Sequence, residues 1–340
     1  MRAVWIRKHG GPDVLEVRET EDPVPGPGEV RVRAKACGLN FAEVSARQGI
    51  YPDAPKPPCV VGYEGAGDVD AVGEGVDDVS IGQRVMFISR FGGHSDTVVV
   101  GRHMMVPIPD ALDYETAAAM PVNYLTAHQM LFAVRRIQSG DKILIHAAAG
   151  GVGTAALQLC QTVEDVTTFG TASAGKHDHV RAQGCDHPID YRSVDYVAAV
   201  REITGGEAEL DLVCDALGGA DWKKGYSLLR PGGMLICFGF ANASKPGKRS
   251  LFKVVGQFIH VPRFHPITMM GDNRAVAGVN LGSMWEHRDH IQGGLQQVVG
   301  YWESGAARPH IDSTFSFEEA GEAHGRLEHG KNVGKVILVP

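Results

Sequence analysis

The residues with the clearest chemical potential form a glycine-rich turn, residues 147–153, which follows the apolar run 142–147 and precedes a helical stretch that begins at Thr154. Backbone N–H groups and the helix dipole at such a turn favour a pyrophosphate, and glycine lets the backbone approach it closely. Ala147 stands where a strict G-x-G-x-x-G motif has its first glycine. We predict that the turn binds a dinucleotide; a purely structural turn is the alternative. The cofactor-binding candidates here are Ala149, Gly150, Gly151, Val152 and Gly153.

The choice of nicotinamide cofactor depends on the end of the next strand, roughly 20 residues beyond the turn. An NAD site usually keeps a carboxylate there, whereas this chain has Thr171, Ser173 and Lys176. Two hydroxyls and an ammonium are donors suited to a 2′-phosphate, so we predict NADPH. Alternatively, Ser173 and Lys176 only begin the next helix, with Ser173 as its N-cap.

The bulk properties exclude several classes of protein. A formal net charge of −7 over 340 residues disfavours a nucleic-acid partner and general adhesion to anionic membranes. No run approaches the roughly 20 uncharged apolar residues that a spanning helix requires, and the N-terminus turns charged too soon for a signal peptide. We therefore expect a cytosolic protein whose six cysteines are buried thiols, because none forms a C-x-x-C pair.

The elements that position these residues divide the chain. Up to about residue 120, short alternating strands broken by Gly and Pro indicate a β-rich, barrel-like domain. Beyond it, apolar strands alternate with helices, which is typical of a doubly wound α/β fold with a six-stranded parallel sheet. The expected strands of this sheet are 142–147, 166–171, 188–191, 210–217, 234–240 and 275–281.

One further cofactor contact follows from this arrangement. The crevice of a doubly wound sheet lies beyond the carboxyl ends of its strands, and Phe238 falls at the end of the fifth strand. We also expect Asn332, near the C-terminus, to line the cofactor. The last strand, 333–339, has no place in a six-stranded sheet, so we expect the C-terminus to return to the first domain.

Several strings give the chain a resemblance to the quinone oxidoreductase branch of the medium-chain dehydrogenase/reductase superfamily. They are residues 36–44, 47–52, 62–67 and 72–76. A more specific resemblance is to the synaptic vesicle amine transport protein (VAT) group, in residues 122–127, 169–173, 187–191, 308–312 and 331–335.

The resemblance covers essentially the whole chain and implies its organisation. It implies a discontinuous GroES-like β-barrel catalytic domain (residues 1–122 and 284–340), a Rossmann NADP-binding domain (residues 123–283) and a homodimer. It also implies that Tyr191 joins Ser173 and Lys176 around the 2′-phosphate, and that Thr126 contacts the nicotinamide region. Alternatively, Tyr191 is an ordinary strand-end aromatic residue and Thr126 caps a helix.

Zinc-dependent members of the superfamily carry three catalytic ligands, and the resemblance places Asn40, Tyr63 and Val122 at these positions. Amide, phenol and alkyl groups do not replace thiolate and imidazole as zinc ligands. Only the Glu of the G-H-E motif remains, as Glu64, and residues 84–100 contain no cysteine for a structural zinc lobe. We therefore expect no metal.

Without a metal, hydrogen-bond donors must polarise the substrate carbonyl, and the quinone reductase pattern points to Asn40 and Tyr51. We expect a zinc-independent, NADPH-dependent reductase of quinones or α,β-unsaturated carbonyls, with solvent or Tyr51 as the proton source. Alternatively, Asn40 is a structural amide between two loops and Tyr51 only a pocket wall.

A second function class remains open: a nucleotide-binding protein with little turnover whose role is interaction or lipid handling. It depends on the apolar, Pro-broken segment 241–270, which could be a lid, a dimer surface or a lipid contact. Membrane contact is the least common of these outcomes, and four basic residues between 245 and 253 are more often solvated than membrane-bound.

Overall fold

The dinucleotide-fold prediction is confirmed by the parallel sheet in the middle of the chain. The computed structural model describes residues 1–206, 208–244, 246–247 and 251–340. In this part of the chain, one sheet has six strands, and every neighbouring pair is parallel. Its spatial order is β11 (His187–Asp190), β10 (Thr167–Ala172), β9 (Lys142–Ile145), β12 (Leu210–Asp215), β13 (Leu229–Cys237) and β14 (Ala275–Gly278). The chain begins in the middle at β9, runs to one edge and then to the other, which is the doubly wound Rossmann order.

Helices connect these strands and cover the sheet. They are α4 (Gly151–Cys160), α5 (His177–Ala182), α6 (Tyr196–Ile203) and α7 (Ala220–Ser227). The central strand β12 is buried along its whole length, as expected for a parallel sheet covered on both faces. After β13 come α8 (Leu251–Ile259) and α9 (Pro266–Asp272), before β14 forms the sheet edge.

A second, largely antiparallel sheet brings the two ends of the chain together. Its main path is β15 (Ile311–Ser316), β16 (Lys335–Val339), β3 (Glu29–Leu39), β5 (Glu64–Val72), β6 (Arg84–Ile88) and β8 (Met105–Pro107), with β7 (Thr97–Gly101) also on β3. A small sheet of β1 (Arg2–Ile6), β2 (Leu15–Glu19) and β4 (Cys59–Val60) lies beside it. Because β16 pairs with β3, the C-terminal strand lies within the N-terminal sheet.

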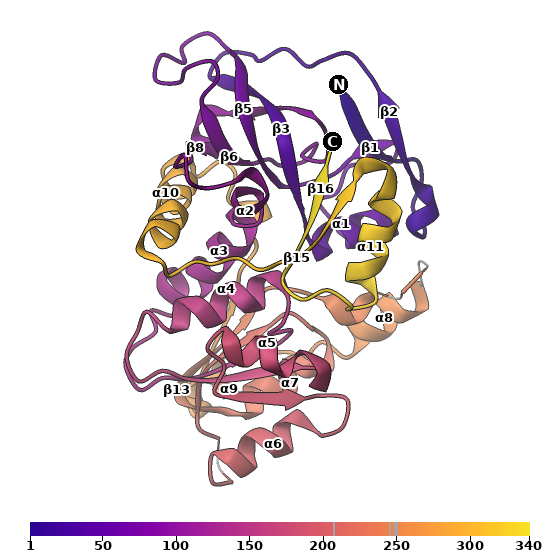
Figure 1. Cartoon of the computed structure of the whole chain (residues 1–340). Coiled ribbons are helices and arrows are strands. Elements are labelled where there is room, and N and C mark those ends of the chain that lie inside the picture. The colour runs from indigo at the N-terminus through magenta and orange to yellow at the C-terminus, as the bar shows by residue number, and fades with distance from the viewer. Residues whose placement is uncertain (207, 245, 248–250) are drawn as a thin grey trace.

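Figure 1 shows the resulting arrangement, in which the indigo N-terminal strands and the yellow C-terminal elements share one lobe, and the magenta-to-orange middle of the chain forms the other. The remaining helices are α1 (Phe41–Gln48), α2 (Tyr114–Ala118), α3 (Pro121–His128), α10 (Arg288–Ser304) and α11 (Ala320–Glu328). The domain bounds 1–122, 123–283 and 284–340 stay a prediction. Among the described residues, none of the helices combines the length and the apolar composition that a membrane crossing requires.

The strands expected at 210–217, 234–240 and 275–281 are Leu210–Asp215, Leu229–Cys237 and Ala275–Gly278 in the structure, and two further local features also differ from the expectations. The first strand of the parallel sheet ends at Ile145 rather than at residue 147, because the chain already turns at Ala147, which has a left-handed φ of 53°. Helix α1 was not predicted, although its start carries a recognisable signal. Asn40 and Glu43 form a capping box at its N-terminus, the N-x-x-E spacing that begins many helices.

Candidate functional site

One large cleft brings together the residues that the sequence singled out. It has a volume of about 950 Å³ and takes lining residues from both sheets and from α8. Every predicted site residue lines it. They are Asn40, Tyr51, Thr126, Ala149, Gly150, Gly151, Val152, Gly153, Thr171, Ser173, Lys176, Tyr191, Phe238 and Asn332. The roles of these residues stay predictions. The cleft lies at the carboxyl ends of the parallel strands, which is where such a sheet binds ligands.

The glycine turn has a geometry suited to binding a phosphate group. Gly150 is the N-cap of the ten-residue helix α4, and the residues of its first turn, whose N–H groups have no partner within the helix, line the cleft. A Cβ on Gly151 would stand 2.3 Å from the Asn123 Nδ2, and one on Gly153 would stand 2.5 Å from the Ala147 carbonyl oxygen. A Cβ on Gly150 would meet only that carbonyl oxygen, at 3.2 Å. Packing therefore requires glycine at 151 and 153, whereas a Cβ at Gly150 would need only a small shift of the Ala147 carbonyl oxygen.

The other end of the cleft carries the residues predicted to choose the cofactor. Ser173 stands at the N-cap of the 3₁₀ turn Ala174–Lys176, but its side chain makes no capping hydrogen bond. The Lys176 ammonium donates to the carbonyl oxygens of Gly330 at 2.7 Å and Asn332 at 2.6 Å, and burial lowers its pKa. Tyr191 is 52% exposed on the cleft wall. The capping alternative for Ser173 thus lacks its hydrogen bond, and Lys176 joins the two lobes.

Thr171 lies in the cleft wall with a hydroxyl that is already engaged. Its Oγ1 lies 3.0 Å from the Nδ1 of the buried His146 and accepts the Ala147 N–H at 3.3 Å. The side chain therefore stabilises the start of the glycine turn. Asn332 is similarly engaged, since its Nδ2 donates to the Gly334 carbonyl oxygen at 2.9 Å.

At the inner wall, a buried polar cluster surrounds Asn40. The Asn40 Nδ2 donates to Glu64 Oε1 at 2.8 Å, and the Lys335 ammonium donates to Asn40 Oδ1 at 2.6 Å and to the same Glu64 oxygen. The second Glu64 oxygen accepts the Val122 N–H at 2.7 Å. Glu43 accepts the Asn40 backbone N–H at 2.9 Å. Asn40 therefore connects a cation and two carboxyl groups. Of these partners, Lys335 and Glu43 were not predicted from the sequence as functional residues.

Burial keeps two members of this cluster uncharged near neutral pH. Desolvation raises the pKa of Glu43 from 4.5 to about 8, against the opposing effect of the Lys335 charge. Desolvation also lowers the pKa of His94 to about 4, and its Nε2 lies 3.8 Å from Glu43 Oε1. The ion pair of the cluster is that of Lys335 with Glu64.

The raised pKa of Glu43 predicts a pH-dependent contribution to stability. Because the folded chain binds this proton more tightly than the unfolded chain, the contribution is full below pH 4.5 and is lost as the pH rises to about 8. We expect the free energy of unfolding of the wild type, minus that of Glu43→Gln, to fall across this window when both are measured by denaturant titration. A difference that stays constant or rises with pH would contradict this account of Glu43.

The outer wall of the cleft is aromatic. The rings of Tyr51 and Tyr63 lie 6.1 Å apart, and Tyr63 lies parallel to Trp285 at 6.5 Å. The Tyr51 hydroxyl reaches Asn280 Oδ1 at 3.5 Å, and desolvation raises its pKa, so the phenol stays protonated. The geometry thus offers planar apolar surface together with the phenols of Tyr51 and Tyr63.

Helix α8 forms part of the cleft wall and also faces solvent. Lys253, Val254 and Phe258 line the cleft, which agrees with the lid interpretation of segment 241–270. On the same helix Phe252 is 94% exposed and Ile259 is 75% exposed. Of the four basic residues noted in this segment, Lys245, Lys248 and Arg249 lie outside the described residues.

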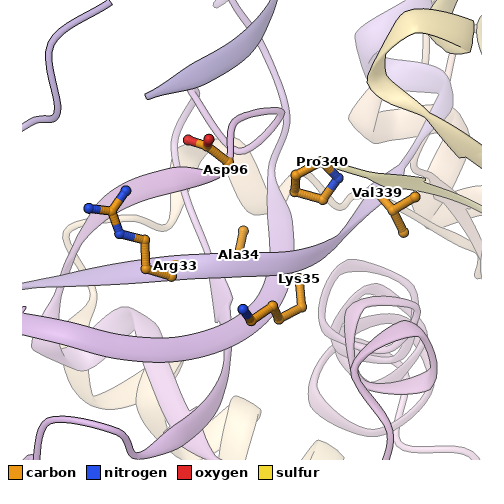
Figure 2. A pocket seen from close by; sticks show the side chains of 6 residues that line it. All are labelled: Arg33, Ala34, Lys35, Asp96, Val339 and Pro340. Carbon is orange, nitrogen blue, oxygen red and sulfur yellow. The ribbon is translucent and has the colours of Figure 1, made fainter.

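A second, smaller hollow of about 390 Å³ lies away from this cleft, between β3, Asp96 and the end of β16 (Figure 2). Its most prominent charged residue, Arg33, is already bound by Asp22 and Asp70. The candidate site is therefore the large cleft.

The positions that the resemblance aligned with zinc ligands carry other chemistry in the structure. Asn40 binds Lys335 and Glu64, Tyr63 packs among aromatic rings, and Val122 contributes a backbone N–H. The described residues contain no group of three or more His, Cys, Asp or Glu side chains arranged to hold a metal ion.

Comparisons with known proteins agree with this geometry. Residues 26–110 match the family model of the alcohol dehydrogenase GroES-like domain, and residues 183–338 match that of the zinc-binding dehydrogenases. The human synaptic vesicle membrane protein VAT-1 homolog is 42% identical over 100% of this chain and 86% of its own length. A Pseudomonas aeruginosa quinone oxidoreductase is 34% identical over 100% of this chain and 99% of its own.

Among solved structures, the Escherichia coli quinone oxidoreductase complexed with NADPH superimposes with a TM-score of 0.88 at 28% identity, over 100% of both chains. These matches confirm the GroES-like and Rossmann architecture. The chain belongs to the medium-chain dehydrogenase/reductase superfamily, in its quinone oxidoreductase branch and with the VAT-1 homologues among its relatives.

Proposed function

We propose that this protein is a zinc-independent, NADPH-dependent reductase of quinones or α,β-unsaturated carbonyls. The observation that carries the proposal is the large cleft, which is lined by the glycine turn and by residues at two different ends. One end has Ser173, Lys176 and Tyr191, and the other has Asn40 and Tyr51 beside an aromatic wall. The medium-chain oxidoreductase family supports the class of reaction.

NADPH fits the residues present. The glycine at position 150 and the N-terminus of α4 suit a pyrophosphate, and Ser173, Lys176 and Tyr191 suit a 2′-phosphate. The NADPH complex of the E. coli relative supports the same cofactor. When bound, NADPH would supply a hydride from its nicotinamide ring, and Thr126, Phe238 and Asn332 are candidates to line it.

The chain's own residues would bind and polarise the acceptor without a metal. A carbonyl gains negative charge on its oxygen as a hydride arrives, and donors aimed at that oxygen lower the barrier. Asn40 and Tyr51 line this part of the cleft, with Tyr51 or solvent as the proton source. The same proposal includes two features that the family resemblance implies, a homodimer and the domain bounds given above.

Turnover tests this proposal directly. Purified protein is mixed with NADPH and a panel of quinones and enones, and NADPH oxidation is followed by absorbance. We expect oxidation above background with at least one acceptor, and a lower rate with NADH. The matched control is Gly150→Val, which fills the proposed phosphate-binding position. Oxidation at the control's rate with every acceptor would reject the reductase assignment.

The exposed apolar side chains of α8 and α9 favour one alternative, a nucleotide-binding protein that handles lipids or partners with little turnover. Ile267 and Met270 on α9 are exposed, as are Phe252 and Ile259 on α8. Sedimentation with liposomes, in the presence and absence of NADPH, tests the lipid version independently of turnover.

A further inference from the structure

Lys335 is a buried cation that nevertheless borders the cleft. It begins β16 immediately after Gly334, which pairs with Gly150 of the glycine turn, and it is 2% exposed. Its partner Glu64 is 0% exposed and does not line the cleft, whereas Lys335 does. Of this ion pair, only the lysine lines the cleft, and its ammonium contacts Asn40, which also lines it.

The hydrogen-bonding groups of the Asn40 side chain are already engaged by neighbouring residues, so few remain for a substrate. An ammonium can only donate and a carboxylate only accept, so the amide must turn Oδ1 to Lys335 and Nδ2 to Glu64. The second Nδ2 hydrogen points to Glu43 Oε1, at 3.4 Å. Lys335 has three N–H donors, of which Asn40 and Glu64 take two. No described residue accepts the third through a hydrogen bond or ion pair.

The surroundings preserve this positive charge at the cleft wall. Glu64 is satisfied by Asn40, Lys335 and the Val122 N–H, which fixes it in place. Glu43 and His94, the other titratable side chains of the cluster, are neutral near pH 7 because burial shifts their pKa values to about 8 and about 4. In a poorly hydrated wall, a fixed ammonium interacts far more strongly with a new negative charge than it would in water.

We propose that Lys335 is a catalytic residue whose third N–H donates to the carbonyl oxygen of the bound acceptor. This inference rests on the proposed function and assigns to Lys335 the role first expected of Asn40. When a hydride adds to the β-carbon of an enone, the C=C π electrons shift and the carbonyl oxygen becomes an enolate oxyanion. Lys335 stabilises that oxyanion without transferring a proton, and solvent then protonates the α-carbon. Asn40 and Glu64 are positioning residues that hold the ammonium in place.

The test separates this role from cofactor binding and from folding. Lys335→Met alone leaves the Glu64 carboxylate buried without its partner, which is strongly destabilising, so the main variant is Lys335→Met with Glu64→Gln. Lys335→Arg retains the charge as the conservative control. Each variant is compared with the wild type by NADPH titration and by steady-state kinetics. A third measurement is the absorbance of 4-nitrophenol bound in the presence of NADP⁺. This absorbance reports the ionisation of a phenol in the cleft.

We expect the double variant to bind NADPH within about threefold of the wild type and to lose roughly 100-fold in kcat. We also expect the wild type and Lys335→Arg to lower the apparent pKa of bound 4-nitrophenol by about one unit or more, and the double variant to abolish that shift. A kcat within threefold of the wild type, or NADPH affinity falling in parallel with activity, would overturn the proposal. If the wild type turns over no acceptor, the reductase proposal fails, but the nitrophenol shift still decides whether Lys335 faces the cleft.

Discussion

Replacement of Gly150 by valine is expected to weaken NADPH binding by roughly 100-fold or more, equivalent to about 2.8 kcal/mol, while leaving the chain folded. The reason is local geometry. Gly150 has an ordinary φ of −83°, and a Cβ there would meet only the Ala147 carbonyl oxygen, at 3.2 Å. The added methyl groups would instead occupy the space beside the first turn of α4, where we place the pyrophosphate. Fluorescence titration with NADPH measures the effect.

The control for this experiment is Gly300→Val in α10, where an added Cβ meets no atom within 4 Å. It carries the same change of side chain in a helix outside the cleft lining. We expect it to bind NADPH as the wild type does. Unchanged NADPH affinity in Gly150→Val, with a melting temperature close to that of the wild type, would show that the phosphate does not bind at the glycine turn.

The second large effect is expected at Lys176. We expect Lys176→Ala to weaken NADPH binding by about 10- to 100-fold, because a charge-assisted hydrogen bond contributes about 1.5–3 kcal/mol. NADH lacks the 2′-phosphate and should lose much less. The small loss for NADH reports the bonds from Lys176 to the Gly330 and Asn332 carbonyl oxygens, which also disappear. The ratio of the two dissociation constants is therefore the quantity to measure.

Lys223→Ala is the matched control, since Lys223 is an exposed lysine on α7 that does not line the cleft. It should leave both affinities unchanged. Equal losses of NADPH and NADH affinity in Lys176→Ala would show that the lysine only joins the lobes, and the cofactor preference would then need another cause.

Local sequence patterns were sufficient for the framework of the site. The apolar strands and the turn at residues 147–153 predicted the doubly wound sheet, because each depends on neighbours in the chain. The strand after the turn then located Ser173 and Lys176 at the end of the cleft. The predicted ends of the strands were less accurate. Ala147, for example, adopts a left-handed backbone conformation that an alanine in the sequence does not indicate.

The inner wall could not be predicted in the same way. Lys335 meets Asn40 and Glu64 only because β16 pairs with β3 and β3 pairs with β5, over separations of 295 and 271 residues. The raised pKa of Glu43 likewise arises from complete burial, which a helix sequence does not specify. Only the N-x-x-E spacing from Asn40 to Glu43 gave a local sign, and it indicated a helix start rather than a site.

The central claim is hydride transfer from NADPH in a cleft without a metal, and one measurement tests it most directly. Protein treated with a strong chelator is assayed with quinones and enones, using NADPH and NADPH deuterated at either face of the nicotinamide C4. The account predicts turnover that the chelator does not change and that slows with only one of the two deuterated cofactors. Turnover that disappears on chelation, or no oxidation above background with any acceptor, would contradict it.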